Sequence, residues 1–336
     1  MTVDEFTSEW HNESPTMIVH TSGSTGKPKD IVIEKKRMVA SANMTCDALD
    51  LHSGDTALLC MPLDYIAGKM LVVRSIVRNM KLITVEPSSH PLKSFVNTTF
   101  NQNASQKIDF AAFVPLQVIK TLEDADERKV FEQIGNVIIG GGAIDDKLEQ
   151  QLNTFSNNIY STYGMTETLS HIALRRISGP DASLWYTPMK GISISLSDEG
   201  CLVISAPELC SETLITNDIA EINSQGQFRI LGRKDNTINT GGIKVQIEEV
   251  ERVLKAKGVE HCQITSVPDS VLGEKIVALI PEDITPEEYN NVTFAIATLP
   301  KFWQPKKIVK IDSLPMTETG KPNRAEAKRL AAAKLQ

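Results

Sequence analysis

Short apolar runs rich in β-branched residues alternate with helix-length stretches between residues 16 and 139. This alternation is typical of βαβ units, which build parallel sheets covered by helices. Hydrophobic residues make up 41% of the chain, which is enough to fill such a core. We therefore predict an α/β core, with strands at 16–20, 57–61, 81–85, 110–114 and 136–139 and helices at 34–48 and 116–133.

A length of 336 residues suggests about two domains, at roughly 150 residues each. Residues 192–207 are predicted to form β structure with a turn at 198–200. The segment GRKDN at 232–236 marks the expected boundary between the two domains. Beyond it, apolar residues recur with helical spacing over 246–256. Further elements are expected there: strands at 263–267, 275–280 and 307–311 and a helix near 287–299. We therefore predict one domain of residues 1–233 and a small α+β domain of residues 234–336.

The charge balance and the shortness of the apolar runs argue against several classes of protein. The net charge is −7, whereas a general nucleic-acid binder needs a basic face. No apolar run approaches the roughly 20 residues that span a bilayer, and the start MTVDEFTSEW lacks the pattern of a signal peptide. We therefore expect no nucleic-acid partner, no integral membrane association and a cytoplasmic location. The cysteines show no metal-ligand spacing and are expected to be reduced thiols: Cys46, Cys60, Cys201, Cys210 and Cys262.

The segment TSGSTGKPK at residues 21–29 directly follows an expected strand. Its glycines allow a ligand to approach the backbone closely, and its hydroxyl and N–H groups can donate to phosphate oxygens. It is not a Walker A loop, because Lys27 is followed by Pro28, which has neither a hydroxyl for Mg²⁺ nor a backbone donor. The segment therefore predicts a phosphate-binding loop of another kind.

Four further motifs follow this loop along the chain: IGGGAI at 139–144, STYGMTE at 161–167, Asp218 with Arg233, and LPMTETGKPNRAEAKRL at 314–330. Together with the loop, they resemble in kind and order the motifs of the superfamily of acyl-CoA synthetases, peptide-synthetase adenylation domains and luciferases. The resemblance runs from about Thr16 to Leu330. It implies a large N-terminal α/β domain of the adenylate-forming type, with a short N-terminal part, and a small mobile C-terminal α+β domain.

The resemblance also implies a site for ATP and Mg²⁺. Tyr163 would lie against the adenine, Thr166 near the phosphates and Glu167 on Mg²⁺, while Asp218 would bind the ribose hydroxyls. Arg233 would lie near the ribose and the α-phosphate, although Asn217 replaces the glycine that is commoner before the aspartate. The full set of residues implied to bind ATP is Thr21, Ser22, Gly23, Ser24, Thr25, Gly26, Lys29, Gly141, Gly142, Ala143, Thr162, Tyr163, Gly164, Asp218 and Arg233.

A two-step reaction is implied, in which a carboxylate attacks the α-phosphate of ATP and coenzyme A then takes the acyl group. Lys321 would be catalytic with Thr166 and Glu167, neutralising charge that develops on the α-phosphate. The small domain would rotate about a hinge at Asp235. The loop NTGGIKV at 239–245 would then approach coenzyme A through Gly241, Gly242 and Lys244.

The identity of the carboxylic acid substrate is suggested by the segment MPLDYIAGKMLVVRS at 61–75 and by the short N-terminal part. Both resemble the o-succinylbenzoate–CoA ligases of menaquinone synthesis. Arg74, with Lys69 as a second candidate, would pair the carboxylate that is not activated, because a guanidinium binds carboxylate in a bidentate manner. Asp64 and Tyr65 depart from the aromatic residue and histidine of the family, and His171 either lines the pocket or is structural.

Two other functions remain open from the sequence: a ligase for another aromatic or aliphatic acid, and an adenylation domain that loads a carrier protein. A non-catalytic nucleotide-binding relic is disfavoured by the joint presence of Glu167, Asp218, Arg233 and Lys321. An oligomer is also left open.

Overall fold

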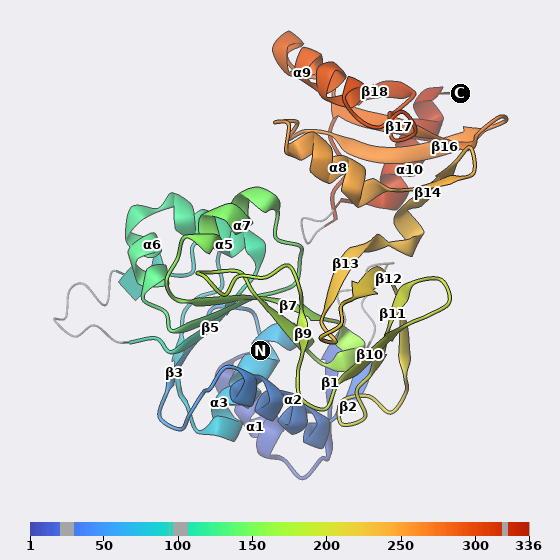
Figure 1. The fold of residues 1–336 in the computed structure, drawn as a ribbon. Helices are drawn as coiled ribbons and strands as arrows, with labels where there is room; N and C mark the ends of the chain where they lie inside the picture. The colour runs from blue at the N-terminus through green and yellow to red at the C-terminus, as the bar shows by residue number, and fades with distance from the viewer. Residues whose placement is uncertain (21–29, 94, 97–106, 318–321, 336) are drawn as a thin grey trace. The chain divides into compact units, whose positions relative to one another are not determined.

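The computed structural model describes residues 1–20, 30–93, 95–96, 107–317 and 322–335 (Figure 1). The expected phosphate loop at 21–29 and Lys321 lie outside these residues. Within the described ranges, no helix is long and apolar enough to cross a membrane.

A seven-stranded sheet with the order β4-β3-β5-β6-β7-β8-β9 forms the centre of the N-terminal part. Neighbours from β4 to β7 are parallel, and β8 and β9 extend the sheet in antiparallel pairing. Strands β3 and β5 are buried at every position, as expected for parallel strands covered on both faces. The bounds are β3 (Thr56–Leu59), β4 (Lys81–Thr84), β5 (Phe110–Phe113), β6 (Asn136–Ile139), β7 (Asn158–Gly164), β8 (His171–Arg176) and β9 (Thr187–Pro188).

Helices cover this sheet on two sides, with α2 and α3 on one side and α5, α6 and α7 on the other (Figure 1). The sequence predicted a single helix at 116–133, and this was wrong. The chain is extended at Asp124, with φ −101° and ψ 121°, and the Asp124 carboxylate accepts hydrogen bonds from the first N–H groups of the second helix. The bounds are α1 (Val3–His11), α2 (Lys35–Ala48), α3 (Ile66–Arg78), α5 (Pro115–Glu123), α6 (Ala125–Glu132) and α7 (Asp146–Asn153).

Two smaller sheets complete this part of the chain. Strands β1 (Thr16–His20) and β2 (Asp30–Glu34) pair on either side of the expected phosphate loop. The second sheet has the order β10-β11-β12-β13, and its first two strands confirm the β structure predicted at 192–207. Its strands are β10 (Ser193–Leu196), β11 (Cys201–Ser205), β12 (Leu214–Ile222) and β13 (Phe228–Arg233), and short 3₁₀ turns lie at η1 (Thr166–Thr168) and η2 (Lys234–Asn236).

The C-terminal part contains a five-stranded sheet in which β15, β14, β17 and β16 are neighbours in that order and β18 pairs with β17. The helix and strand ranges predicted beyond residue 245 are all found here, each within a few residues. Apolar residues of α8, α9 and the strands form its core. The bounds are β14 (Thr237–Thr240), β15 (Ile243–Gln246), α8 (Ile247–Lys255), β16 (Gln263–Asp269), β17 (Gly273–Pro281), α9 (Pro286–Ala297), β18 (Lys307–Ile311) and α10 (Arg324–Leu335).

The chain packs as two compact units. The first comprises residues 1–195, 203–214 and 222–229, and the second comprises residues 196–202, 215–221 and 230–336. The predicted domain division between residues 233 and 234 and the mobility of the small domain remain predictions.

Candidate active site

A glycine turn follows β6 at the carboxyl ends of the parallel strands, where α/β sheets bind their ligands. The turn packs closely on β7, because a Cβ at Gly140 would come within 2.5 Å of Thr162 Oγ1. Thr162 also donates a hydrogen bond to the Ile139 carbonyl at 3.2 Å. Gly141 has φ +78°, a conformation that favours glycine. Gly141 and Ala143 are exposed and Gly142 is half-buried, so the expected adenine-binding turn is open to a ligand.

Tyr163, the next residue on β7, belongs to an aromatic cluster. Its ring lies 5.1 Å from that of Phe228 and 5.9 Å from that of Tyr186, edge to face in both cases. The Tyr186 hydroxyl in turn lies 2.8 Å from Ser161 Oγ. Packing of this kind fixes the plane of a ring, so the residue expected to contact adenine has a set orientation. Tyr186 and Phe228 could not be identified from the sequence, because both are distant in sequence from the motif that they support.

The segment after Tyr163 turns back sharply through η1 into β8. A Cβ at Gly164 would lie 2.3 Å from the Ser170 carbonyl oxygen, so only glycine fits there. Thr168 closes the turn, because its hydroxyl accepts from the Met165 N–H at 3.1 Å and lies 2.8 Å from the Ser170 carbonyl. Thr166 is half-buried and Glu167 is exposed on this turn. Within the described residues, the Glu167 carboxylate has no hydrogen-bond or ion-pair partner, so its oxygens can ligate a cation.

Arg74 lies on α3 and is only 2% exposed. Its Nη2 donates a hydrogen bond to Ser170 Oγ at 2.8 Å, which places the guanidinium beside the turn that carries Thr166 and Glu167. Its Nε is buried and has no hydrogen-bond partner in the described chain. Burial lowers the Arg74 pKa to about 10. Arg74 has no carboxylate partner among the described residues, which is costly for a buried cation.

Lys69 is also buried on α3, but it has different neighbours from Arg74. Its Nζ donates to the Ile18 carbonyl of β1 at 3.3 Å. The two departures from the family pattern, Asp64 and Tyr65, are exposed. Asp64 Oδ1 lies 3.7 Å from the Met1 amine nitrogen. Of the two candidate acid-binding residues, Arg74 is therefore the one that contacts the turn after the STYGMTE motif, through Ser170.

His171 is buried beside Arg74 at the start of β8. Its Nε2 lies 3.0 Å from Thr45 Oγ1, and its Nδ1 lies 3.3 Å from Ser170 Oγ. Burial, and then the charge of Arg74, hold the His171 pKa well below 6.5. The imidazole is therefore neutral at physiological pH.

In the second unit, the expected ribose-binding residues lie together. Arg233 Nη1 donates to Asp218 Oδ1 at 3.2 Å, and Arg233 Nη2 donates to Asp235 Oδ2 at 2.9 Å. Asn217, which replaces the commoner glycine, donates to the same oxygen of Asp235 at 3.2 Å. The expected hinge residue Asp235 is thus linked to the residues expected to contact the sugar.

Gly241 and Gly242 form the two-residue turn between β14 and β15. Their φ angles are +59° and +80°, as a tight hairpin turn of this length requires. A Cβ at Gly242 would meet no atom within 4 Å, so this side of the turn is open. Lys244 is exposed on β15. The hairpin thus presents a cation and a bare backbone on a surface.

The catalytic lysine predicted at 321 lies outside the described residues, and described residues before and after it contact one another. Met316 and Pro322 form an isolated β-bridge, and the Asn323 N–H donates to the Pro315 carbonyl at 2.9 Å. Arg324 then makes a bidentate ion pair with Glu251 of α8, with distances of 2.6 and 2.7 Å.

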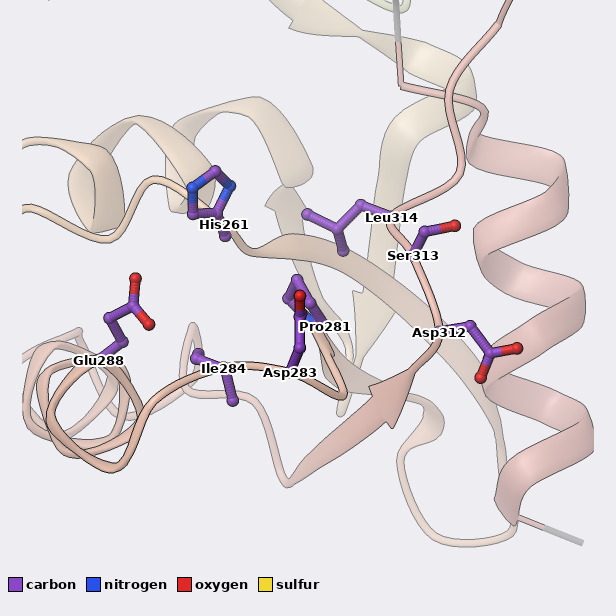
Figure 2. A pocket seen from close by; sticks show the side chains of 8 residues that line it. All are labelled: His261, Pro281, Asp283, Ile284, Glu288, Asp312, Ser313 and Leu314. Atoms are coloured by element: carbon purple, nitrogen blue, oxygen red, sulfur yellow. The ribbon is translucent and has the colours of Figure 1, made fainter.

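A pocket of about 400 Å³ lies elsewhere in the second unit, lined by side chains from the ends of several elements (Figure 2). His261 precedes β16, Asp283 lies between β17 and α9, Glu288 lies in the first turn of α9, and Asp312 follows β18. Its carboxylates would repel the phosphates of ATP and the carboxylate of an acid. None of the predicted site residues lines it, and in the described chain no group of acidic, histidine or cysteine side chains is arranged to hold a metal ion.

Comparisons with known proteins identify the family of this chain. Residues 3–203 match the family model described as AMP-binding enzyme. The chain is similar to a protein of Geobacillus sp. (strain WCH70) named 2-succinylbenzoate–CoA ligase. The two are 26% identical over 358 residues, which cover 97% of this chain and 71% of the relative.

Solved structures show the same mixed α/β fold. The acyl-CoA synthetase (AMP-forming)/AMP-acid ligase II-like protein of Dyadobacter fermentans has a TM-score of 0.64 and 32% identity, covering 99% of this chain and 93% of that one. The o-succinylbenzoate CoA synthetase of Bacillus subtilis, in complex with its acyl-adenylate intermediate, has a TM-score of 0.73 and 21% identity, covering 93% and 68%. The chain therefore belongs to the AMP-binding enzyme family, and it is an ATP-using ligase of the AMP-forming acyl-CoA synthetase type.

Proposed function

We propose that this enzyme joins o-succinylbenzoate to coenzyme A through an acyl-AMP intermediate, a reaction of menaquinone biosynthesis. The names of the relative from Geobacillus and of the structure from Bacillus subtilis support the choice of acid. The observation that carries the proposal is the buried Arg74 guanidinium beside Ser170, because a dicarboxylic substrate would supply the anion that this cation lacks in the described chain.

The second carboxylate of the acid explains why a buried arginine is useful. Only one carboxylate is activated, and the other would lose its hydration on entering a partly dry pocket. A bidentate contact with Arg74 would compensate for this loss and would satisfy the buried Nε. A monocarboxylic acid would leave the guanidinium unpaired, so the same residue would select for the diacid and against its simpler analogues.

ATP would be held by the residues that the motifs mark. The turn at Gly141, Gly142 and Ala143 would face the adenine together with Tyr163, and Asp218 and Arg233 would bind the ribose. The open glycine turn, the fixed tyrosine ring and the Asp218–Arg233 contact support these roles. Residues 21–29, together with Thr162 and Gly164 on either side of Tyr163, complete the set that we assign to ATP.

Glu167 has the right chemistry for Mg²⁺, which prefers oxygen ligands and is commonly held by one or two carboxylates together with substrate phosphates. Its exposed carboxylate has no partner in the described chain. Bound with ATP, the ion would neutralise charge on the leaving pyrophosphate. Glu167 would hold it, and Thr166 would contact the phosphates from the same turn.

For the two chemical steps, we assign charge neutralisation at the α-phosphate to Lys321. Rotation about Asp235 would then bring the hairpin at Gly241, Gly242 and Lys244 to coenzyme A. The bare backbone of that turn and its exposed lysine suit a narrow thiol arm with an anionic end.

The test is release of AMP that depends on coenzyme A, measured with o-succinylbenzoate, benzoate, 4-coumarate, acetate and a medium-chain fatty acid. We expect selective turnover of o-succinylbenzoate. Turnover of another acid instead would refute the assignment of the acid while leaving the ligase chemistry intact. If pyrophosphate exchange depended on an acid but free coenzyme A did not accept the acyl group, a carrier-loading domain would replace this proposal.

A further inference from the structure

A chain of hydrogen bonds connects Arg74 to the interior of the first unit. Arg74 Nη2 lies 2.8 Å from Ser170 Oγ, which lies 3.3 Å from His171 Nδ1. His171 Nε2 lies 3.0 Å from Thr45 Oγ1, and this hydroxyl donates to the Ser41 carbonyl at 3.1 Å. The residues come from α2, α3 and the segment that enters β8. Ser170 lies 96 residues from Arg74, and His171 lies 126 residues from Thr45.

The donor and the acceptor of every hydrogen bond in this network follow from the groups at its two ends. Arg74 can only donate, so Ser170 Oγ accepts from it and uses its own proton toward His171 Nδ1. At the other end, Thr45 donates its single proton to the Ser41 carbonyl and therefore accepts from His171 Nε2. His171 is then neutral and carries its proton on Nε2, and each hydroxyl donates once and accepts once.

A protonated His171 could not take part in this chain of hydrogen bonds. It would place a proton on Nδ1, facing the Ser170 hydroxyl, and a second cation beside Arg74 in a region with little water. Ser170 would then lose its acceptor and could turn away from the guanidinium. The neutral imidazole therefore fixes the direction of the Ser170 hydroxyl, and this hydroxyl fixes the position of Arg74 Nη2.

We infer that Thr45, His171 and Ser170 are positioning residues that hold the Arg74 guanidinium in the orientation required to bind the non-reacting carboxylate of the acid. This inference rests on the proposed function of Arg74. The three residues act through Arg74. They should therefore affect the affinity for a diacid, and should not affect ATP binding or the rate of chemistry at saturation.

Thr45→Val is the sharpest test, because it removes one hydroxyl at the far end of the chain with little change in volume. We expect the KM for o-succinylbenzoate to rise about three- to tenfold, with kcat and the KM for ATP unchanged, and Thr45→Ser to restore the wild-type KM. Ser170→Ala should raise this KM about tenfold or more, because it removes a hydrogen bond to a charged group. The matched control is Thr121→Val, since Thr121 is also fully buried and its hydroxyl has no partner in the described chain.

Two monocarboxylic analogues separate positioning from general damage: 4-oxo-4-phenylbutanoate, which lacks the ring carboxylate, and 2-butanoylbenzoate, which lacks the chain carboxylate. Whichever is turned over should show the same KM in the wild type and in Thr45→Val. An equal loss with the diacid and the analogue, or a wild-type KM for the diacid in Thr45→Val, would overturn the inference. So would an NMR spectrum that placed the His171 proton on Nδ1.

The failure of this inference can be distinguished from failure of the proposed function. If Arg74→Met loses its preference for the diacid while Thr45→Val keeps it, Arg74 binds the carboxylate and only the positioning role is wrong. If Arg74→Met keeps the preference for the diacid, both proposals fall.

Discussion

Replacing Arg74 by methionine should weaken the enzyme without weakening the fold. Methionine keeps an unbranched side chain of similar reach but removes a cation that is 2% exposed. Burial lowers the Arg74 pKa from 12.5 to about 10, and the group is charged in both the folded and the unfolded chain at pH 7. The difference therefore opposes folding, by roughly 3 kcal/mol at about 1.4 kcal/mol for each tenfold change in proton affinity.

The lost hydrogen bond to Ser170 offsets part of this gain, by about 1.5–3 kcal/mol. We therefore expect the free energy of unfolding of Arg74→Met to be equal to that of the wild type or up to about 1–2 kcal/mol higher. For catalysis the expectation is opposite. Loss of a buried charge partner typically costs about 2–5 kcal/mol of binding, so kcat/KM for o-succinylbenzoate should fall by a factor between about 30 and 4,000.

Two assays check these values. Urea unfolding at pH 7 gives the stability, with an unchanged m-value showing that the two unfolding curves can be compared. Coenzyme A-dependent AMP release, with the diacid and with its monocarboxylic analogues, gives the selectivity. A fall in unfolding free energy of more than about 2 kcal/mol, together with equal losses for diacid and analogue, would show that Arg74 is a structural residue and does not bind the second carboxylate.

Three further predictions concern other parts of the chain. Since the His171 pKa is held well below 6.5, the unfolded state gains a proton that the folded state does not as pH falls below about 6.5. Stability should therefore decline there by up to about 1.4 kcal/mol per pH unit, and His171→Asn should remove that slope in urea titrations at pH 5–6.5. Glu251→Gln should cost about 2–4 kcal/mol of stability, because it breaks a bidentate, largely buried pair with Arg324. Glu249→Gln, in a solvent-exposed ion pair on the same helix, should cost less than about 1 kcal/mol in the same thermal or urea unfolding experiment. Lys321→Ala should abolish adenylation, measured by pyrophosphate exchange, yet still convert supplied acyl-AMP to thioester, and equal loss of both steps would contradict its assigned role.

The strands of the parallel sheet could be predicted because each is a short apolar run bounded by polar residues. Strand β6, for example, was predicted at 136–139 and is found at Asn136–Ile139. Helix α3 could not be predicted in this way, because its run LVVRSIV is rich in β-branched residues that favour strands. Packing overrides that local preference, since Gly68 lets the helix approach the Pro62 carbonyl, where a Cβ would lie at 2.3 Å.

The site residues divide in a similar way. Motifs that are contiguous in the chain, such as STYGMTE, could be identified by their resemblance to a family. The neighbours that support them could not, because Thr45 and His171 are 126 residues apart and no local pattern relates them. Sequence reasoning also left His171 between a pocket-lining and a structural role. The fold places it in contact with both Thr45 and Ser170, and so connects it to Arg74.

Selection of the diacid by Arg74 is tested most directly by a competition in one tube among o-succinylbenzoate and its two monocarboxylic analogues, with ATP, Mg²⁺ and coenzyme A. Mass spectrometry of the thioesters formed at early times gives the ratios of kcat/KM directly, because an error in the enzyme concentration affects all three acids equally. We predict that o-succinylbenzoyl-CoA exceeds either other product by at least about a hundredfold in the wild type, and that Arg74→Met brings the ratios close to one. Comparable amounts of all products from the wild-type enzyme would contradict the claim that a buried arginine selects a second carboxylate.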